Sequence, residues 1–230
     1  EKSVAFGVGL TTAFGRSTTF SKDSIRRYNT PYFTELYALS LNPSVAWRVN
    51  DALSLAVGVA VLYSEFDLRQ IYPWSLATGN PAAPDGETQF EADGTGVGFN
   101  AALTWRIAER HRASLTYRSS VDLGYEGDLR LTGLPPAGPG SPALFSERSD
   151  FETDIEFPAV AAAGYGVQVT DRLRLEANVE WVQHSLFEDL TLDAGDNTGL
   201  LPANVIPADW EDNWTFGAGA DYRLSDRWML

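Results

Sequence analysis

Hydrophobic and polar residues alternate along most of this chain with a period of two. From Ala113 to Leu131 the odd positions are apolar or small, whereas the even positions are mostly polar or charged. A period of two places successive side chains on opposite faces of a β-strand. The pattern therefore predicts about eight strands, at residues 4–10, 33–49, 53–63, 97–107, 113–131, 151–169, 173–187 and 213–224.

These segments are longer than the strands of soluble β-proteins, which usually have about five or six residues. A tilted strand of about 9 to 11 residues crosses a membrane, so the longer segments can cross it and project beyond it. We expect an all-β fold, a transmembrane antiparallel up-and-down β-barrel. Its apolar face would contact lipid, and its polar face would line the lumen with residues such as Arg118, Asp122, Glu126, Glu176 and Glu180.

Aromatic residues gather near the ends of the expected strands, as in the interfacial girdles of membrane barrels. The alternative is that they are core residues of a soluble β-domain. The first girdle would contain Trp47, Trp105, Tyr222 and Trp228, and the second Tyr63, Tyr125, Trp181 and Phe187.

Tight turns and long polar connections join the expected strands in alternation. Turns fall at residues 50–51, 109–111, 170–171 and 225–226, which are rich in Asn, Asp and Ser. Long connections fall at 16–32, 70–93, 132–148 and 193–210. Outer-membrane barrels have short periplasmic turns and long extracellular loops, so the asymmetry indicates which rim is which.

Composition narrows the functional classes. No run of about 18 apolar residues is present, so a helical membrane span is excluded. The chain has no cysteine, which excludes disulfides and thiolate metal sites. A net charge of -14 and a pI near 4.4 argue against nucleic-acid binding, because phosphate neutralisation requires clustered Lys and Arg. We expect the acidic residues in the loops and the lumen.

The visible strands do not complete a barrel. The start at Glu1 reads as a cut, and Leu230 falls just inside a new strand. Because an open sheet edge cannot lie in hydrocarbon, we expect further strands from the natural protein and regard residues 1–230 as a partial barrel domain.

In its order of motifs the chain resembles the FadL/TodX family of outer-membrane transporters for long-chain fatty acids and other hydrophobic compounds. The match runs along nearly the whole chain, and its most characteristic pieces are LTYRS at 115–119 and VEWVQHSLFEDL at 179–190. The resemblance implies a Gram-negative outer membrane and a fourteen-stranded barrel plugged by an N-terminal hatch. The hatch and the closing strands would be absent from this chain.

The resemblance also implies a route: capture by extracellular loops, transfer to a pocket in the barrel, and lateral release beside a kinked strand. Two loops carry apolar residues that are unexpected in water. The alternative is that they only pack the loops together. The capture candidates are Ile71, Tyr72, Trp74 and Leu76 in one loop, and Leu134, Leu144 and Phe145 in the other.

The kink of the family aligns with Ala13, Phe14 and Gly15, although a plain strand end would also explain them. A ligand carboxylate would need a luminal cation, for which Arg69 roughly matches a basic position of the family. The chain departs from some relatives at Glu211, where they carry Lys. This departure raises the case for neutral hydrocarbons.

The remaining motifs do not indicate a phosphate, metal or catalytic site. Gly94, Gly96 and Gly98 form a GxGxG string followed by a β pattern, so we read them as small luminal residues and not as a phosphate site. His111 and His184 are far apart, and we expect no metal, cofactor or catalytic dyad. The expected partners are a hydrophobic ligand and membrane lipid, with a monomeric barrel. The rivals are a general diffusion porin, an outer-membrane lipase and an adhesive barrel.

Overall fold

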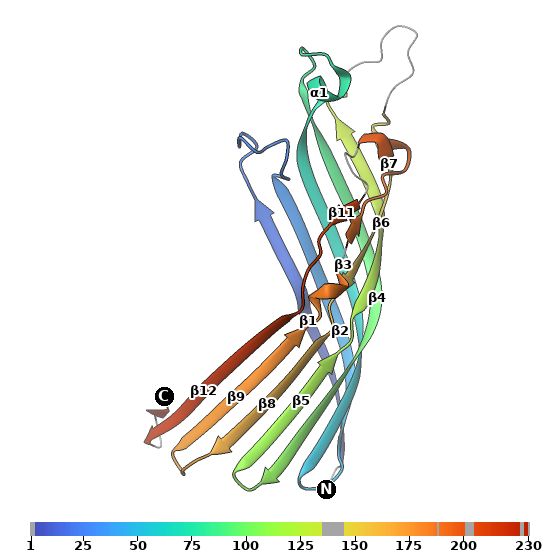
Figure 1. The fold of residues 1–230 in the computed structure, drawn as a ribbon. Coiled ribbons are helices and arrows are strands. Elements are labelled where there is room, and N and C mark those ends of the chain that lie inside the picture. The colour runs from blue at the N-terminus through green and yellow to red at the C-terminus, as the bar shows by residue number, and fades with distance from the viewer. Residues whose placement is uncertain (1–2, 135–144, 188, 201–204, 226–227, 230) are drawn as a thin grey trace.

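The computed structural model describes residues 3–134, 145–187, 189–200, 205–225 and 228–229, and most of them lie in strands. Figure 1 shows long strands that run side by side in one twisted sheet. The strands are β1 (Val4–Thr19), β2 (Phe33–Arg48), β3 (Leu53–Pro73), β4 (Asp85–Ala108), β5 (His111–Arg118), β6 (Val121–Thr132), β7 (Arg148–Phe157), β8 (Val160–Gln168), β9 (Leu173–Val182), β10 (Asp189–Thr191), β11 (Val205–Pro207), β12 (Asn213–Ser225) and β13 (Trp228–Met229). The helical turns are α1 (Trp74–Thr78), η1 (His184–Leu186) and η2 (Gly195–Leu200).

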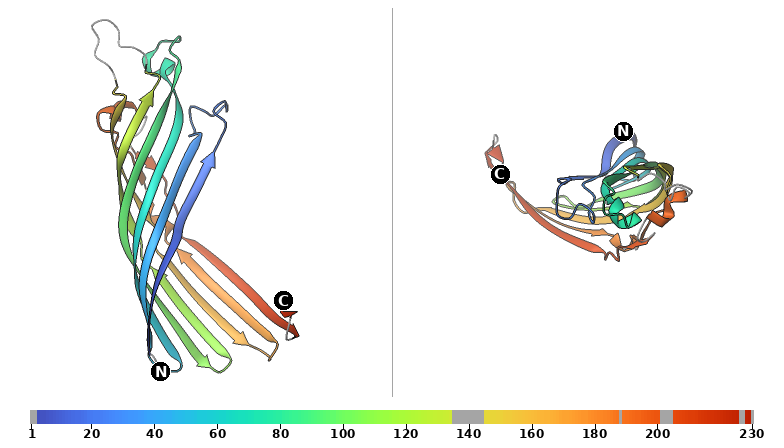
Figure 2. Two further views of the ribbon diagram at one scale, coloured as in Figure 1. Left: turned by 180° about the vertical axis from the view of Figure 1, so that it is seen from behind. Right: turned by 90° about the horizontal axis from the view of Figure 1, so that it is seen from above.

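All strand pairs of the main sheet are antiparallel, in the order β1, β2, β3, β4, β5, β8, β9, β12, β13. In the loop half, β6 replaces β5 beside β4, and β7 pairs with β6. β5 with β6, and β7 with β8, are therefore two long strands that are each interrupted once. The described strands thus confirm the predicted up-and-down meander, and Figure 2 shows that it curls around an open interior without closing into a ring.

The turn half of the sheet has an apolar outer face. On β3 the odd residues Val57, Val59, Val61 and Tyr63 are exposed, whereas Ala60 and Leu62 are buried on the concave face. Neighbouring strands continue this outer belt because paired residues share a face. The belt includes Phe6, Val8, Phe99, Leu115 and Phe216. It is the surface expected to contact lipid.

Beyond Tyr63 the outer face becomes acidic while the inner face becomes apolar. Glu65 pairs with Asp93, and Asp67 pairs with Glu91, on the outside of β3 and β4. Phe66 and Phe90 face inward and are buried. The acidic outer face indicates that this part of the wall projects into water. β3 and β4 remain paired along it up to Pro73 and Asp85. The connection predicted at 70–93 is therefore only 74–84, and β1 likewise shortens the connection at 16–32 to 20–32.

Three strands change the face on which their odd and even residues lie. β1 has a bulge between Thr12 and Phe14, β5 and β6 are separated at 119–120, and β7 and β8 at 158–159. On one side of each point the even-numbered residues face inward, and on the other side the odd-numbered residues do. Leu123 and Tyr125 are therefore buried inside, and Asp122 and Glu126 lie outside. The predicted luminal positions of Asp122 and Glu126 are wrong for this reason, whereas Glu180 does face the lumen.

The predicted girdles hold in part. Trp47, Trp105, Tyr222 and Trp228 are exposed near the turn rim, and Tyr63 is exposed on the outer face at the far side. Tyr125 is buried in the interior and Phe187 packs against the core, so neither belongs to a girdle. Among the described residues, no helix is long and apolar enough to cross a membrane.

Candidate functional site

A cavity of about 780 Å³ lies on the concave face at the level where the three strands change face. We call it the waist pocket. β1 to β9 all contribute to its wall, together with the interruptions at 119–120 and 158–159. Its apolar lining includes Phe14, Ala60, Leu62, Val121, Phe157, Val160 and Val182, and its polar lining includes Asn42, Asn100, Arg118, Glu180 and His184.

The aromatic side of the waist pocket comes from two distant strands. Phe14 follows the bulge in β1, which turns its side chain inward. It stacks on Phe157, the last residue of β7, with ring centroids 4.4 Å apart and planes inclined by 9°. The stack joins an edge strand to the interrupted strand across the concave face.

Hydrogen bonds fix the interruptions that shape the pocket. Phe99 donates its backbone N–H to Oγ of Ser119 at 2.9 Å and accepts the N–H of Ser119 at 2.9 Å. At the second interruption Gln183 donates its N–H to the carbonyl of Ala159 at 2.9 Å. The strands therefore turn over without leaving these backbone groups unpaired.

Small residues on β4 make room for β6 beyond the interruption at 119–120. A Cβ added to Gly96 would lie 2.6 Å from Cγ1 of Val121, and one added to Gly98 would lie 2.6 Å from Cγ2 of Val121. Gly94 also faces inward, against the backbone of Gly124. The interpretation of the GxGxG string as small inward residues is confirmed.

Above the waist pocket the interior is filled by an apolar core. Phe90 and Phe151 contact each other with centroids 4.9 Å apart, and Phe66 lies 6.3 Å from Phe151. The hydroxyl of Tyr125 donates to Oγ of Ser64 at 2.7 Å. Apolar side chains thus occupy much of the interior between the loops and the waist pocket.

The structure brings most of the predicted capture residues together as packed side chains. Trp74 is fully buried, donates Nε1–H to the carbonyl of Thr132 at 2.9 Å, and has its ring centroid 5.7 Å from that of Phe145. Tyr72 contacts Trp74, and Leu134 packs against the same core. These side chains thus pack the two loops together, as the alternative to ligand capture predicted.

The remaining capture candidates behave differently. Ile71 lies on the outer face of β3, opposite Glu87, and is half-buried. Leu76 in α1 is 77% exposed. Leu144 lies outside the described residues.

Arg69 does not point into the lumen. It shares the outer face of β3 with Asp67, pairs with its carboxylate at 2.5 Å, and lies over the ring of Phe33 with Cζ 5.1 Å from the centroid. The expected luminal orientation of Arg69 is wrong because β3 runs without a bulge from the lipid belt to its end. Arg118, at the end of β5, is the arginine that lines the waist pocket, and sequence reasoning did not single it out as a ligand contact.

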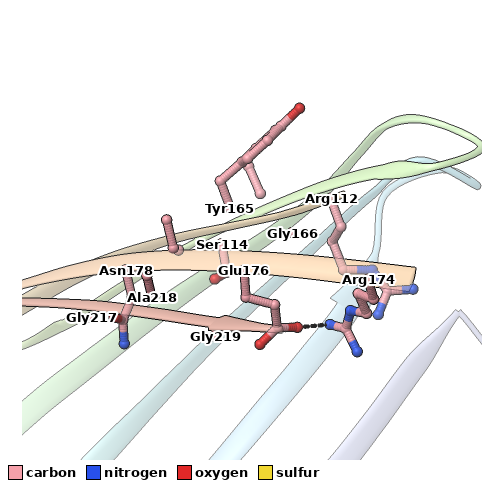
Figure 3. A pocket seen from close by; sticks show the side chains of 13 residues that line it. Arg112, Ser114, Tyr165, Gly166, Arg174, Glu176, Asn178, Gly217, Ala218 and Gly219 are labelled. Carbon is pink, nitrogen blue, oxygen red and sulfur yellow. Dashed lines mark ion pairs between the residues drawn. The ribbon is translucent and has the colours of Figure 1, made fainter. Parts of the chain in front are cut away.

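A second hollow of about 540 Å³ lies nearer the turns on the concave face, where β5, β8, β9 and β12 meet. Figure 3 shows its polar floor, in which Arg174 forms an ion pair with Glu176 on the same strand. Gly164, Gly166, Gly217 and Gly219 leave the floor open. Among the described residues, no group of three or more His, Cys, Asp or Glu could hold a metal ion.

The loop at 20–32 is fastened to the outside of β4 well above the lipid belt. Glu87 accepts hydrogen bonds from the Tyr32 hydroxyl at 2.6 Å and from Nζ of Lys22 at 2.9 Å. Burial alone would raise the pKa of Glu87, but these two hydrogen bonds outweigh it and lower the pKa below its usual value. The contacts of Lys22 with Glu87 and with Tyr32 raise the pKa of Lys22.

Comparison with known proteins agrees with this architecture. A family model described as "Outer membrane protein transport protein (OMPP1/FadL/TodX)" matches residues 1–230. The long-chain fatty acid transport protein of Salmonella typhi is 26% identical over 251 residues, which cover 93% of this chain and 55% of that relative. Outer membrane protein P1 of Haemophilus influenzae is 23% identical, with 98% of this chain and 52% of that relative covered. The chain spans about half the length of these curated relatives.

Solved structures show the same fold. The crystal structure of a Pseudomonas aeruginosa FadL homologue superposes with a TM-score of 0.83 at 25% identity, covering 99% of this chain and 55% of the homologue. The Ralstonia pickettii toluene transporter TbuX superposes with a TM-score of 0.72 at 21% identity, covering 100% of this chain and 64% of TbuX. The match to TbuX supports the fold alone.

Proposed function

Since the chain belongs to the outer membrane protein transport protein family (OMPP1/FadL/TodX), we propose that the full-length protein carries hydrophobic compounds, long-chain fatty acids first among them, across the outer membrane. Relatives with similar sequences are named long-chain fatty acid transport proteins. Transport, and not catalysis, is the proposed role.

The observation that carries this proposal is the waist pocket beneath an apolar interior. A volume of about 780 Å³ lies within the range of about 300 to 1,000 Å³ that is usual for small-molecule sites. Apolar side chains line the interior from Trp74 to Phe157. A general diffusion porin would instead have a polar, water-filled lumen.

For capture, the proposal uses the loop residues around α1. Exposed Leu76 would meet the ligand first, and displacement of the packed Tyr72, Trp74, Leu134 and Phe145 would admit it to the interior. Leu144 belongs to the same proposed set by its sequence position.

For release, the proposal uses Ala13, Phe14 and Gly15. The bulge there breaks the register of β1 against β2 beside the waist pocket, and Phe14 lines that pocket. A β-bulge locally disrupts the ladder, so this is a weak point in the wall. The ligand would leave sideways into the membrane at this point.

Uptake measurements test the transport proposal. Cells that express the full-length protein should accumulate tritiated oleate, or toluene, faster than cells with an empty vector. The purified protein should show little steady conductance in planar bilayers, because the interior is packed. Large conductance without uptake of either compound would identify a porin and overturn the proposal.

A reversible cross-link tests the release point. Thr12 and Leu39 are paired across β1 and β2 next to the bulge, and the chain has no cysteine of its own. Oxidation of a Thr12→Cys, Leu39→Cys variant should slow oleate uptake several-fold while binding persists, and reduction should restore uptake. The control is Leu41→Cys with Val61→Cys, a pair between β2 and β3 away from the bulge. Equal uptake by the oxidised and reduced test variant would refute lateral release here.

A further inference from the structure

We propose that residues 189–197, which we call the strap, form a hinged cover on the edge of β7, and that the ligand enters the apolar interior when the strap swings away. The strap includes β10 and the start of η2. This inference rests on the proposed function and concerns the control of access to its central site.

The strap lies along an edge of β7 that the other described strands leave open. β6 occupies the opposite edge, and Figure 1 shows the strap beside β7, above the upper ends of β9 and β12. Glu152 and Asp193 each donate a backbone N–H to the other's carbonyl at 2.9 Å. Leu190 and Leu192 pack against the apolar core, and Ala194 is fully buried. The strap therefore covers part of the apolar interior.

The two ends of segment 187–210, which contains the strap, are fastened to each other. The rings of Phe187 and Trp210 contact each other with centroids 5.0 Å apart. Asp212, directly before β12, accepts hydrogen bonds from Nε1 of Trp181 at 2.9 Å and from the backbone N–H of Ser185 at 3.1 Å. These contacts form the hinge, so that motion of the strap need not disturb β9 or β12.

A buried side chain fastens the far end of the strap to the residues that precede β7. Oδ1 of Asn197 accepts the backbone N–H of Ser146 at 2.9 Å, and Nδ2 donates to the carbonyl of Ser146 and to Oγ of Ser149, each at 3.0 Å. Ser146 directly follows Phe145, whose ring packs against Trp74. Release of Asn197 would therefore also loosen the packed capture residues.

The strap is held less firmly than the strands of the wall. β6 pairs with β7 along nearly its whole length, whereas one bridge joins the described residues of the strap to β7. Ser149 and Thr153 add side-chain hydrogen bonds to strap carbonyls at 2.9 and 2.7 Å. The bridge also sets the carboxylates of Glu152 and Asp193 opposite each other, and like charges in such a pair are destabilising. The strap should therefore open locally while the wall stays folded.

A reversible cross-link across the bridge tests this inference. Residues that exchange both backbone hydrogen bonds have Cα atoms about 5.5 Å apart, which suits a disulfide. The full-length protein with Glu152→Cys and Asp193→Cys is placed in lipid nanodiscs, and the binding and release of tritiated oleate are timed. Oxidation should slow association and dissociation several-fold by the same factor and leave the affinity unchanged, because a closed strap blocks the path without altering the bound state. Reduction should restore both rates.

The control is Asp122→Cys with Glu156→Cys, a pair that joins β7 to β6 at its other edge. Its oxidation should change neither rate. Asn197→Ala should act in the opposite direction and increase both rates, together with hydrogen exchange of residues 189–197.

Equal rates for the oxidised and reduced test variant would overturn the inference. A change confined to dissociation would also overturn it, because the strap would then only contact the bound ligand. Failure of the unmodified protein to bind oleate would instead overturn the proposed function.

Discussion

At the scale of single residues, the waist pocket depends on glycines, which have no side chain. Gly98 faces inward where a Cβ would meet Val121 at 2.6 Å and Oγ of Ser119 at 2.8 Å. Ser119 cannot move away without losing its hydrogen bond to Phe99. The sequence pattern identified Gly98 as small and luminal, but the contact with Val121 depends on a turned strand that no local signal revealed.

Gly98→Ala should therefore destabilise the full-length barrel by about 1 to 3 kcal/mol through overpacking. The measurement is the free energy of unfolding from urea titration of the refolded protein in detergent. Gly219→Ala is the control, because a Cβ at that inward position meets nothing within 4 Å. If the two variants were equally stable, the crowding at Gly98 would be contradicted.

The fastening of the loop at 20–32 should depend on pH. The folded pKa of Glu87 is below its unfolded value of 4.5, so its contribution to stability is present above that value and is lost as the pH falls through the lowered folded pKa. At pH 7, Glu87→Gln should increase hydrogen exchange of residues 20–32, corrected for intrinsic rates. The difference from the unmodified protein should vanish once the pH has fallen below that lowered folded pKa. A difference that persists there would rule out the carboxylate as the fastener.

The residue scale also shows why the site was only partly predictable. Phe14 was identified through its place in a family motif, and the structure does turn it into the pocket. Arg69 and Arg118 look alike in an alternating pattern, because period alone says nothing about which face is inside. Arg69 lies outside because β3 keeps its odd positions on the outer face up to its end, and Arg118 lies inside because the even positions of β5 line the lumen.

At the scale of elements, the alternation of a strand depends on both its backbone and its surroundings. In β3 the backbone is regular, and the apolar positions shift from Val61 and Tyr63 outside to Phe66 and Leu68 inside where lipid gives way to water. In β5 and β6 the backbone turns over at the same level, so odd positions stay apolar throughout. The second case looks like one uniform strand in the sequence, and this is why Asp122, Glu126 and Tyr125 were misplaced.

Cysteine labelling tests whether the strand turns over between β5 and β6 or continues without turning over. In intact cells, Asp122→Cys and Glu126→Cys in the full-length protein should react with a membrane-impermeant maleimide, because both face outward above the lipid belt. Leu123→Cys should be protected, since Leu123 is fully buried. No other cysteine of this chain would interfere. The reverse labelling pattern would mean that β5 continues into β6 without turning over.

At the scale of the whole molecule, the described sheet has edges that cannot face hydrocarbon. β1 pairs only with β2, and its outward residues Phe6 and Val8 are 86% and 75% exposed. Unpaired backbone groups in lipid cost several kcal/mol each. The strand order, the two rims and the membrane location were predictable from alternation and loop length, whereas the described strands do not form a closed ring.

Residues 1–230 expressed alone should therefore fail to form a compact barrel. The full-length protein should migrate faster in SDS gels when unheated than when boiled, and the fragment should show no such shift. A heat-modifiable monomeric fragment would contradict this expectation. Refolding both proteins in the same detergent provides the control for assay conditions.

The turn at 119–120 also limits how the gene for this barrel can change in length. Replacement of a codon in β6 (Val121–Thr132) alters one side chain, but deletion of one codon there would exchange the surroundings of the residues on one side of the deletion. Deletion of two codons would restore them. Over evolutionary time, insertions and deletions within these strands should therefore survive in even numbers, while the loops accept any number.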